Sequence, residues 1–61
     1  MYDKQIAIAL AKEIGGKHPN LKNQIQDLYE LTCEDIEDGG NASHAWGLFM
    51  DDIKELANSF N

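Results

Sequence analysis

Residues 33–46 (CEDIEDGGNASHAW) hold a thiol, four carboxylates and a histidine around a double glycine, a composition that could bind a metal ion. Counted as a calcium loop from Asp35, Gly40 falls at position 6, where such loops need a glycine. Position 12 should carry a bidentate glutamate but is Trp46, and position 5 is a glycine. The stretch therefore lacks most of the ligands that calcium requires.

Zinc binding or catalysis finds no better support in the sequence. A zinc site would need Cys33, His18 and His44 plus a carboxylate, and none of these falls at the short paired spacing that prepares a tetrahedral site. The sequence contains no glycine-rich phosphate loop, nucleophile elbow or paired-histidine helix. We therefore expect a protein without enzymatic activity, metal or cofactor, in which Cys33 is a small buried apolar residue.

The distribution of charge is the more informative property of the chain. The formal net charge is −6; residues 1–22 hold four lysines and two carboxylates (+2), whereas residues 23–61 hold one lysine and nine carboxylates (−8). Arginine, the residue best suited to phosphate and base-edge recognition, is absent. This balance makes direct nucleic-acid binding unfavourable and favours a protein partner with a basic surface.

Hydrophobic periodicity and helix-breaking residues predict an all-α fold of three helices near residues 3–15, 20–38 and 42–59, in one domain spanning 1–61. They would form a small three-helix bundle or an open three-helix array. No stretch of the sequence alternates cleanly between apolar and polar residues, as a β-strand would. The first predicted apolar stripe is Tyr2, Ile6, Leu10 and Ile14, with Ala7 and Ala11 beside them, and the second is Leu21, Ile25, Leu28, Tyr29, Thr32 and Ile36. The third helix carries a strict heptad seam of Ala42, Trp46, Phe49, Ile53, Leu56 and Phe60.

The turn residues predict where these helices begin and end. Gly15 and Gly39 would end the first and second helices. Asn20 would cap the start of the second, and Asn41 or Ser43 the start of the third. Asn41-Ala42-Ser43 also matches the motif for N-glycosylation, but helix capping is the better explanation of these residues.

Residues 9–26 suggest an alternative function. The stretch ALAKEIGGKHPNLKNQI (Ala9–Ile25) resembles the core of a helix-turn-helix motif, with Ala11 at the close approach and Gly15 at the turn. It departs from the motif at Gly16, where an aliphatic residue is usual, and at Ile25, which comes one residue late. The resemblance implies a DNA-binding module, and its DNA-facing residues would be Lys17, Asn20, Lys22, Asn23 and Gln26.

The interpretation that uses most of the sequence is a small acidic protein-binding module. An inhibitor or modulator of a host nucleic-acid enzyme, of the kind that viruses and mobile elements encode, fits its size and charge. A structural subunit of a helical assembly is a further alternative, and the third helix could form a homodimer. The predicted partner-binding residues are Glu34, Asp35, Glu37, Asp38, Asp51, Asp52, Glu55 and Trp46.

The location of the protein is predicted from the same features. A single cysteine, no basic and apolar leader, and no apolar run longer than Ile6–Ala11 favour a cytoplasmic protein without a membrane segment.

Overall fold

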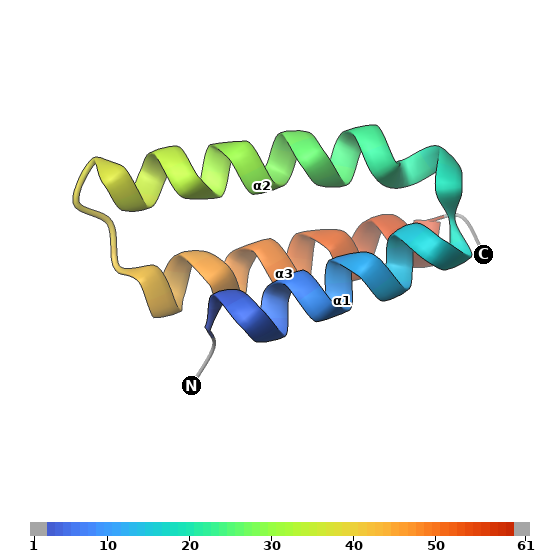
Figure 1. Cartoon of the computed structure of the whole chain (residues 1–61), viewed down its shortest axis with the longest axis horizontal. Helices are drawn as coiled ribbons and strands as arrows, with labels where there is room; N and C mark the ends of the chain where they lie inside the picture. Colours follow the sequence, from blue (N-terminus) through green and yellow to red (C-terminus); the bar gives the residue numbers. More distant parts are fainter. Residues whose placement is uncertain (1–2, 60–61) are drawn as a thin grey trace.

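The computed structural model describes residues 3–59, which form three α-helices and one short 3₁₀ turn (Figure 1). Helix α1 spans Lys4–Lys17, the turn η1 spans Pro19–Leu21, α2 spans Lys22–Glu37 and α3 spans Ala42–Ser59. Residues 3–59 contain no strand, and all three helices contact one another. The prediction of a small all-α three-helix bundle is therefore confirmed.

The three helices share the long axis of the molecule (Figure 1). α2 runs back antiparallel to α1, and α3 returns in the direction of α1. α3 packs extensively against both other helices, whereas α1 and α2 make far fewer contacts with each other. The bundle is therefore open on the side where α1 and α2 face each other.

Helix α1 is longer than the sequence predicts. It begins after Asp3, whose Oδ1 accepts a hydrogen bond from the Ile6 amide at 2.9 Å, as an N-cap carboxylate does. The prediction that Gly15 ends it is wrong, since the helix continues through both glycines to Lys17. The stop comes at His18, which precedes a proline and adopts φ −130° and ψ 75°. A residue before proline is disfavoured in helical conformation, so Pro19 ends the helix.

The start of α2 also differs from the prediction. Asn20 is not its N-cap, because Pro19–Leu21 first form a 3₁₀ turn and Leu21 takes the N-cap position without a side-chain hydrogen bond. The turn instead satisfies amides through the backbone: the Leu21 amide donates to the His18 carbonyl at 2.9 Å.

The turn from α2 to α3 follows the prediction. Gly39 has a φ of 101°, a conformation that side chains disfavour, and its amide donates to the Ile36 carbonyl at 3.1 Å. The Asn41 Oδ1 accepts a hydrogen bond from the His44 amide at 3.0 Å. Gly39 therefore stops α2, and Asn41 caps α3.

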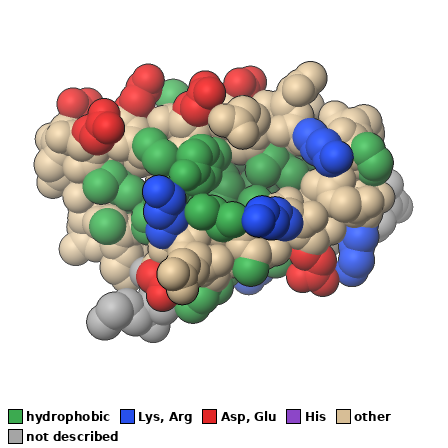
Figure 2. All heavy atoms as spheres, in the orientation of Figure 1, with side chains coloured by type: hydrophobic (Ala, Val, Ile, Leu, Met, Phe, Trp, Pro, Cys, Tyr) green, Lys and Arg blue, Asp and Glu red, His purple; other side chains and the backbone are tan. Residues whose placement is uncertain are grey.

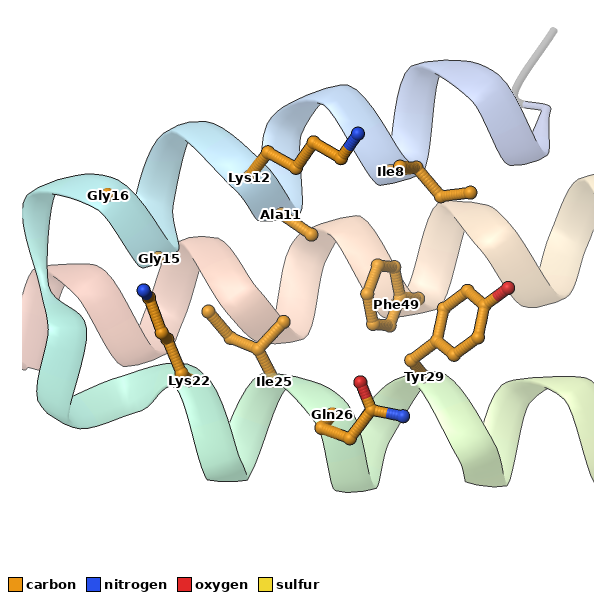
Figure 3. Close-up of a pocket in the computed structure, with 10 residues that line it drawn as sticks. All are labelled: Ile8, Ala11, Lys12, Gly15, Gly16, Lys22, Ile25, Gln26, Tyr29 and Phe49. Carbon is orange, nitrogen blue, oxygen red and sulfur yellow. The ribbon is translucent and has the colours of Figure 1, made fainter.

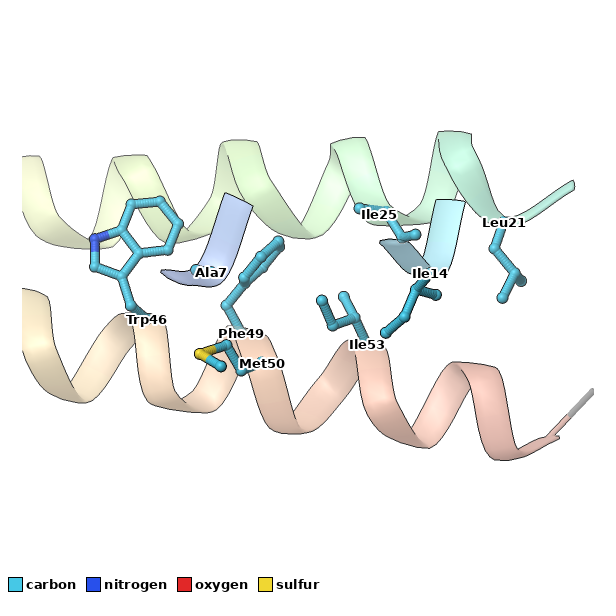
Figure 4. Close-up of a cluster of buried hydrophobic side chains, with 8 residues drawn as sticks. All are labelled: Ala7, Ile14, Leu21, Ile25, Trp46, Phe49, Met50 and Ile53. Atoms are coloured by element: carbon cyan, nitrogen blue, oxygen red, sulfur yellow. The ribbon is translucent and has the colours of Figure 1, made fainter. Parts of the chain in front are cut away.

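The core lies along α3, whose seam residues Trp46, Phe49 and Ile53 are buried (Figure 4). The heptad prediction is confirmed for these three residues, while Ala42 at its start is exposed. Tyr2 and Phe60 lie outside the described residues. The buried cluster comprises Ala7, Ile14, Leu21, Ile25, Trp46, Phe49, Met50 and Ile53.

The inner face of α1 lies on the Ala7 side of the predicted stripe rather than on its Ile6 side. Ile6 is 47% exposed, whereas Ala7 is fully buried. Ala7, Ala11 and Ile14 recur at helical spacing on the inner face. Because alanine side chains are small, the backbone of α1 can approach that of α3 closely. Ala7 therefore lies on the inner face of α1, and the larger Ile6 lies on the outer face.

Candidate functional site

The solvent side of α2 and its C-cap carries a row of carboxylates. We call Asp27, Glu30, Glu34, Glu37 and Asp38 the acidic face of α2. They follow one another at intervals of three or four residues, with Asp38 directly after Glu37, so they share one side of the helix. All five are exposed, and Figure 2 shows acidic side chains along the edge of the molecule that α2 forms. The face lies opposite the core-facing residues Ile25 and Ile36.

An exposed leucine lies at the edge of this acidic face. Leu31 is 61% exposed, more than Ile6 or Leu48, the other large exposed hydrophobic residues of the described chain. It is four residues from Asp27 and three from Glu34, so the two carboxylates flank it. The side of α2 that faces water therefore combines negative charge with one large apolar side chain.

The acidic face has no cationic partner in the described structure. The chain contains neither lysine nor arginine between Lys22 and Lys54. The one ion pair among residues 3–59 joins Lys17 to Glu13 within α1, at 3.5 Å. Carboxylates near a helix C-terminus oppose the helix dipole, and like charges at i,i+4, such as Glu30 and Glu34, repel. The arrangement therefore costs stability, and no ion pair offsets this cost among residues 3–59.

The predicted acidic residues of α3 lie apart from those at the end of α2. Asp52 and Glu55 border a shallow groove of about 540 Å³ together with Gln24, Asp27 and Leu28 of α2. Asp51 borders a different hollow, beside Leu48. The last turn of α2 lies about ten residues from Asp27, roughly 15 Å along the helix. The acidic residues of α3 and those in the last turn of α2 therefore lie on separate parts of the surface, and Asp27 borders the same groove as Asp52 and Glu55.

Asp35 and Trp46 complete the predicted partner-binding residues. Asp35 is exposed at the α2–α3 turn, where its carbonyl accepts a hydrogen bond from the Gly40 amide at 3.0 Å. Trp46 is only 4% exposed, and its ring lies 5.6 Å from those of Tyr29 and Phe49. The indole is part of the core, so a partner could not reach it without displacing α3. The buried seam likewise leaves the predicted dimer of the third helix only its outer residues, such as Leu48.

The two histidines considered for metal binding lie at opposite ends of the bundle. His18 follows α1 at the end of the bundle that holds η1, whereas His44 lies in the first turn of α3 at the other end (Figure 1). Cys33 is half-buried and packs against the core. Within residues 3–59 no group of three or more histidine, cysteine or acidic side chains could hold a metal ion.

The helix-turn-helix resemblance is not matched by the arrangement of the helices. In that motif two helices cross at about 90–120°. Here α1 and α2 run antiparallel along the same axis (Figure 1). The residues that the resemblance assigned to DNA, Lys17, Asn20, Lys22, Asn23 and Gln26, are exposed but are not presented by a crossing recognition helix.

A groove between α1 and α2 is the surface feature that sequence reasoning missed. It has a volume of about 560 Å³ and extends from Ile8 to Gly16 on α1 and from Lys22 to Tyr29 on α2 (Figure 3). Its base is a side chain of α3, Phe49. Helical periodicity identifies which residues face inward, but it does not say how far apart two helices stand.

Comparisons with known protein families, with curated proteins and with solved structures gave no match. None of the helices in the described part of the chain is both long and apolar enough to cross a lipid bilayer.

Proposed function

We propose that this protein is a non-enzymatic binding module that attaches to a basic surface of another protein through the acidic face of α2. The supporting observation is that this face presents five exposed carboxylates and no basic residue, with the exposed Leu31 at its edge beside Asp27 and Glu34. Electrostatic complementarity of this kind steers association and selects partners. Leu31 would add apolar contact area beside these carboxylates.

The partner class that best fits this surface is an enzyme that handles nucleic acid. Such enzymes bind phosphates in basic grooves, and a row of carboxylates on a rigid helix can occupy the same positive potential. Binding there would compete with the nucleic acid, so the protein would act as an inhibitor or modulator. A virus or mobile element would have use for such a protein.

The proposal is tested by reversing charge at two places on the same chain. E34K/E37K changes the acidic face, and E13K/D51K changes two exposed carboxylates elsewhere, on α1 and α3. Each variant raises the formal net charge by four, from −6 to −2. The wild-type chain and both variants are immobilised and used to capture proteins from a lysate. A protein that the wild-type chain captures is then purified, and its affinity for all three forms of the chain is measured by titration.

We expect E34K/E37K to weaken the affinity for the captured partner by about tenfold or more, or about 1.4 kcal/mol. The control should stay near the wild-type affinity. L31S should also weaken binding while leaving the net charge unchanged, which separates the apolar contribution from the electrostatic one. Equal losses in both charge variants would show that only total charge matters, and retention of binding by E34K/E37K would refute the proposal.

A further inference from the structure

The groove between α1 and α2 has an apolar base and polar margins (Figure 3). Ile25 is 8% exposed and Phe49 is 1% exposed, while Ile8, Ala11 and Tyr29 are half-buried. Figure 2 shows this apolar surface between α1 and α2, with lysines beside it. Apolar concave surfaces bordered by a few polar groups are where proteins bind ligands or partner segments.

The groove follows from how the helices pack. α1 and α2 both pack mainly on α3, which leaves space between them and exposes part of the core at Tyr29. On the α1 side the wall is low, because Ala11, Gly15 and Gly16 have small side chains or none. A Cβ at Gly16 would meet nothing within 4 Å. The α1 side of the groove therefore leaves room for another polypeptide segment beside Gly16.

The two cations on the groove come from opposite walls. Lys12 of α1 and Lys22 of α2 are both exposed and both border it. The Lys22 stem lies along α1, with its Cγ 3.6 Å from the position of a Cβ at Gly15. On α2, Glu30 accepts a hydrogen bond from the groove residue Gln26 at 3.3 Å. No carboxylate is among the residues that line the groove.

From this combination we propose that the α1–α2 groove binds an acidic amphipathic helix of a partner protein. The groove spans about eight residues of α1, or roughly 12 Å, the length of two helical turns. A helix of that length would place two or three apolar side chains over Phe49 and Ile25, and acidic residues on both of its flanks would meet Lys12 and Lys22. This surface is distinct from the acidic face of α2, and the inference does not depend on the proposed function.

The test uses two synthetic helical peptides of about 18 residues, blocked at both ends, because shorter peptides are seldom helical in water. Both carry leucine at i, i+3, i+4 and i+7; one has glutamate on the flanks and the other has lysine. We expect the glutamate peptide to bind the wild-type protein at least about tenfold more tightly than the lysine peptide. Its NMR shift changes should centre on Ile8, Ile25 and Tyr29.

Charge-reversed variants make the test specific to the groove. K12E/K22E should reverse the preference between the two peptides, whereas K17E/K54E, which has the same net charge but alters lysines outside the groove, should keep it. Circular dichroism checks that both variants remain helical. An unchanged preference in K12E/K22E, or shift changes located elsewhere, would overturn the proposal.

Two further measurements distinguish a partner helix from two other occupants of the groove, a second copy of the chain and a fatty acid. Sedimentation of the protein alone would show self-association that K12E/K22E abolishes if a second copy covered the groove. Groove shifts with dodecanoate but with neither peptide would indicate a fatty-acid site. Either result would overturn the assignment to a partner helix, while leaving the proposal for the acidic face of α2 to its own test.

Discussion

Glu34 should destabilise the fold that carries it, and replacing it by glutamine should make the protein more stable. Glu34 is four residues from both Glu30 and Asp38, and it lies in the last turn of α2 with no cationic partner in the described structure. Each like-charge pair costs about 0.2–0.5 kcal/mol, and the unfavourable interaction with the helix dipole adds about 0.3 kcal/mol. Glutamine has nearly the same helix propensity as glutamate, so E34Q should gain roughly 1 kcal/mol.

Thermal unfolding followed by circular dichroism measures this gain. For a domain of this size, about 1 kcal/mol corresponds to a rise in Tm of roughly 4–8 °C. The rise should shrink in 1 M NaCl, where the Debye length is only about 3 Å. E13Q is the matched control: it removes one charge too, but it breaks the ion pair with Lys17, so its Tm should stay level or fall slightly.

A Tm for E34Q that equals or lies below that of the wild type would refute the reasoning, as would a rise that persists in high salt. If the gain is found and the affinity for the captured partner falls in the same variant, the acidic face is a surface kept for binding at the expense of stability. Proteins often show such a trade-off where a functional site breaks a local structural rule.

Three further predictions concern the fold. F49A should cost about 3–5 kcal/mol, because Phe49 is buried between helices, and this is from about a third to all of the roughly 3–9 kcal/mol expected for 61 residues. Urea unfolding should show a sharply lowered midpoint or no transition. N41A should cost about 1 kcal/mol by removing the acceptor of the His44 amide, and N41D, which keeps an acceptor, should not; comparable midpoints would argue against the cap. G16A should gain about 0.5–1 kcal/mol in a helical position with free space, whereas G39A should lose about 1 kcal/mol at its positive φ, and equal effects of the two would contradict the assigned backbone conformations.

The elements of this fold could be predicted because local signals in the sequence agree with one another. The seam of Trp46, Phe49 and Ile53 has a period that only a helix satisfies, and Gly39 and Asn41 mark the turn before it by their conformational and capping preferences. Where local signals conflict, prediction failed. Gly15 indicated a helix end, but a glycine costs a helix only about 1 kcal/mol, and the stronger constraint of Pro19 placed the end later.

The candidate site was predicted in part. The acidic residues of α2 are on the surface as their spacing indicated, since the same periodicity that places Ile25 and Ile36 inward places Glu34 outward. Trp46 was proposed as an anchor because of its residue type, and the structure places it among Tyr29 and Phe49 instead. Residue type alone does not distinguish a core aromatic from an interface aromatic.

The sequence by itself determined the helical class, the turn between α2 and α3 and the acidic outer side of α2, because these depend on residues close together in the chain. Tertiary structure alone decided the register of α1, which turns Ala7 inward and Ile6 outward, and the separation of α1 from α2 that opens the groove over Phe49. The orientation of α1 and its distance from α2 both depend on how closely the helix backbones can approach each other. That distance is set by the side chains of two helices at once, so the sequence of one helix does not fix it. For the same reason, Lys12 and Lys22, ten residues apart in sequence, become two walls of one surface.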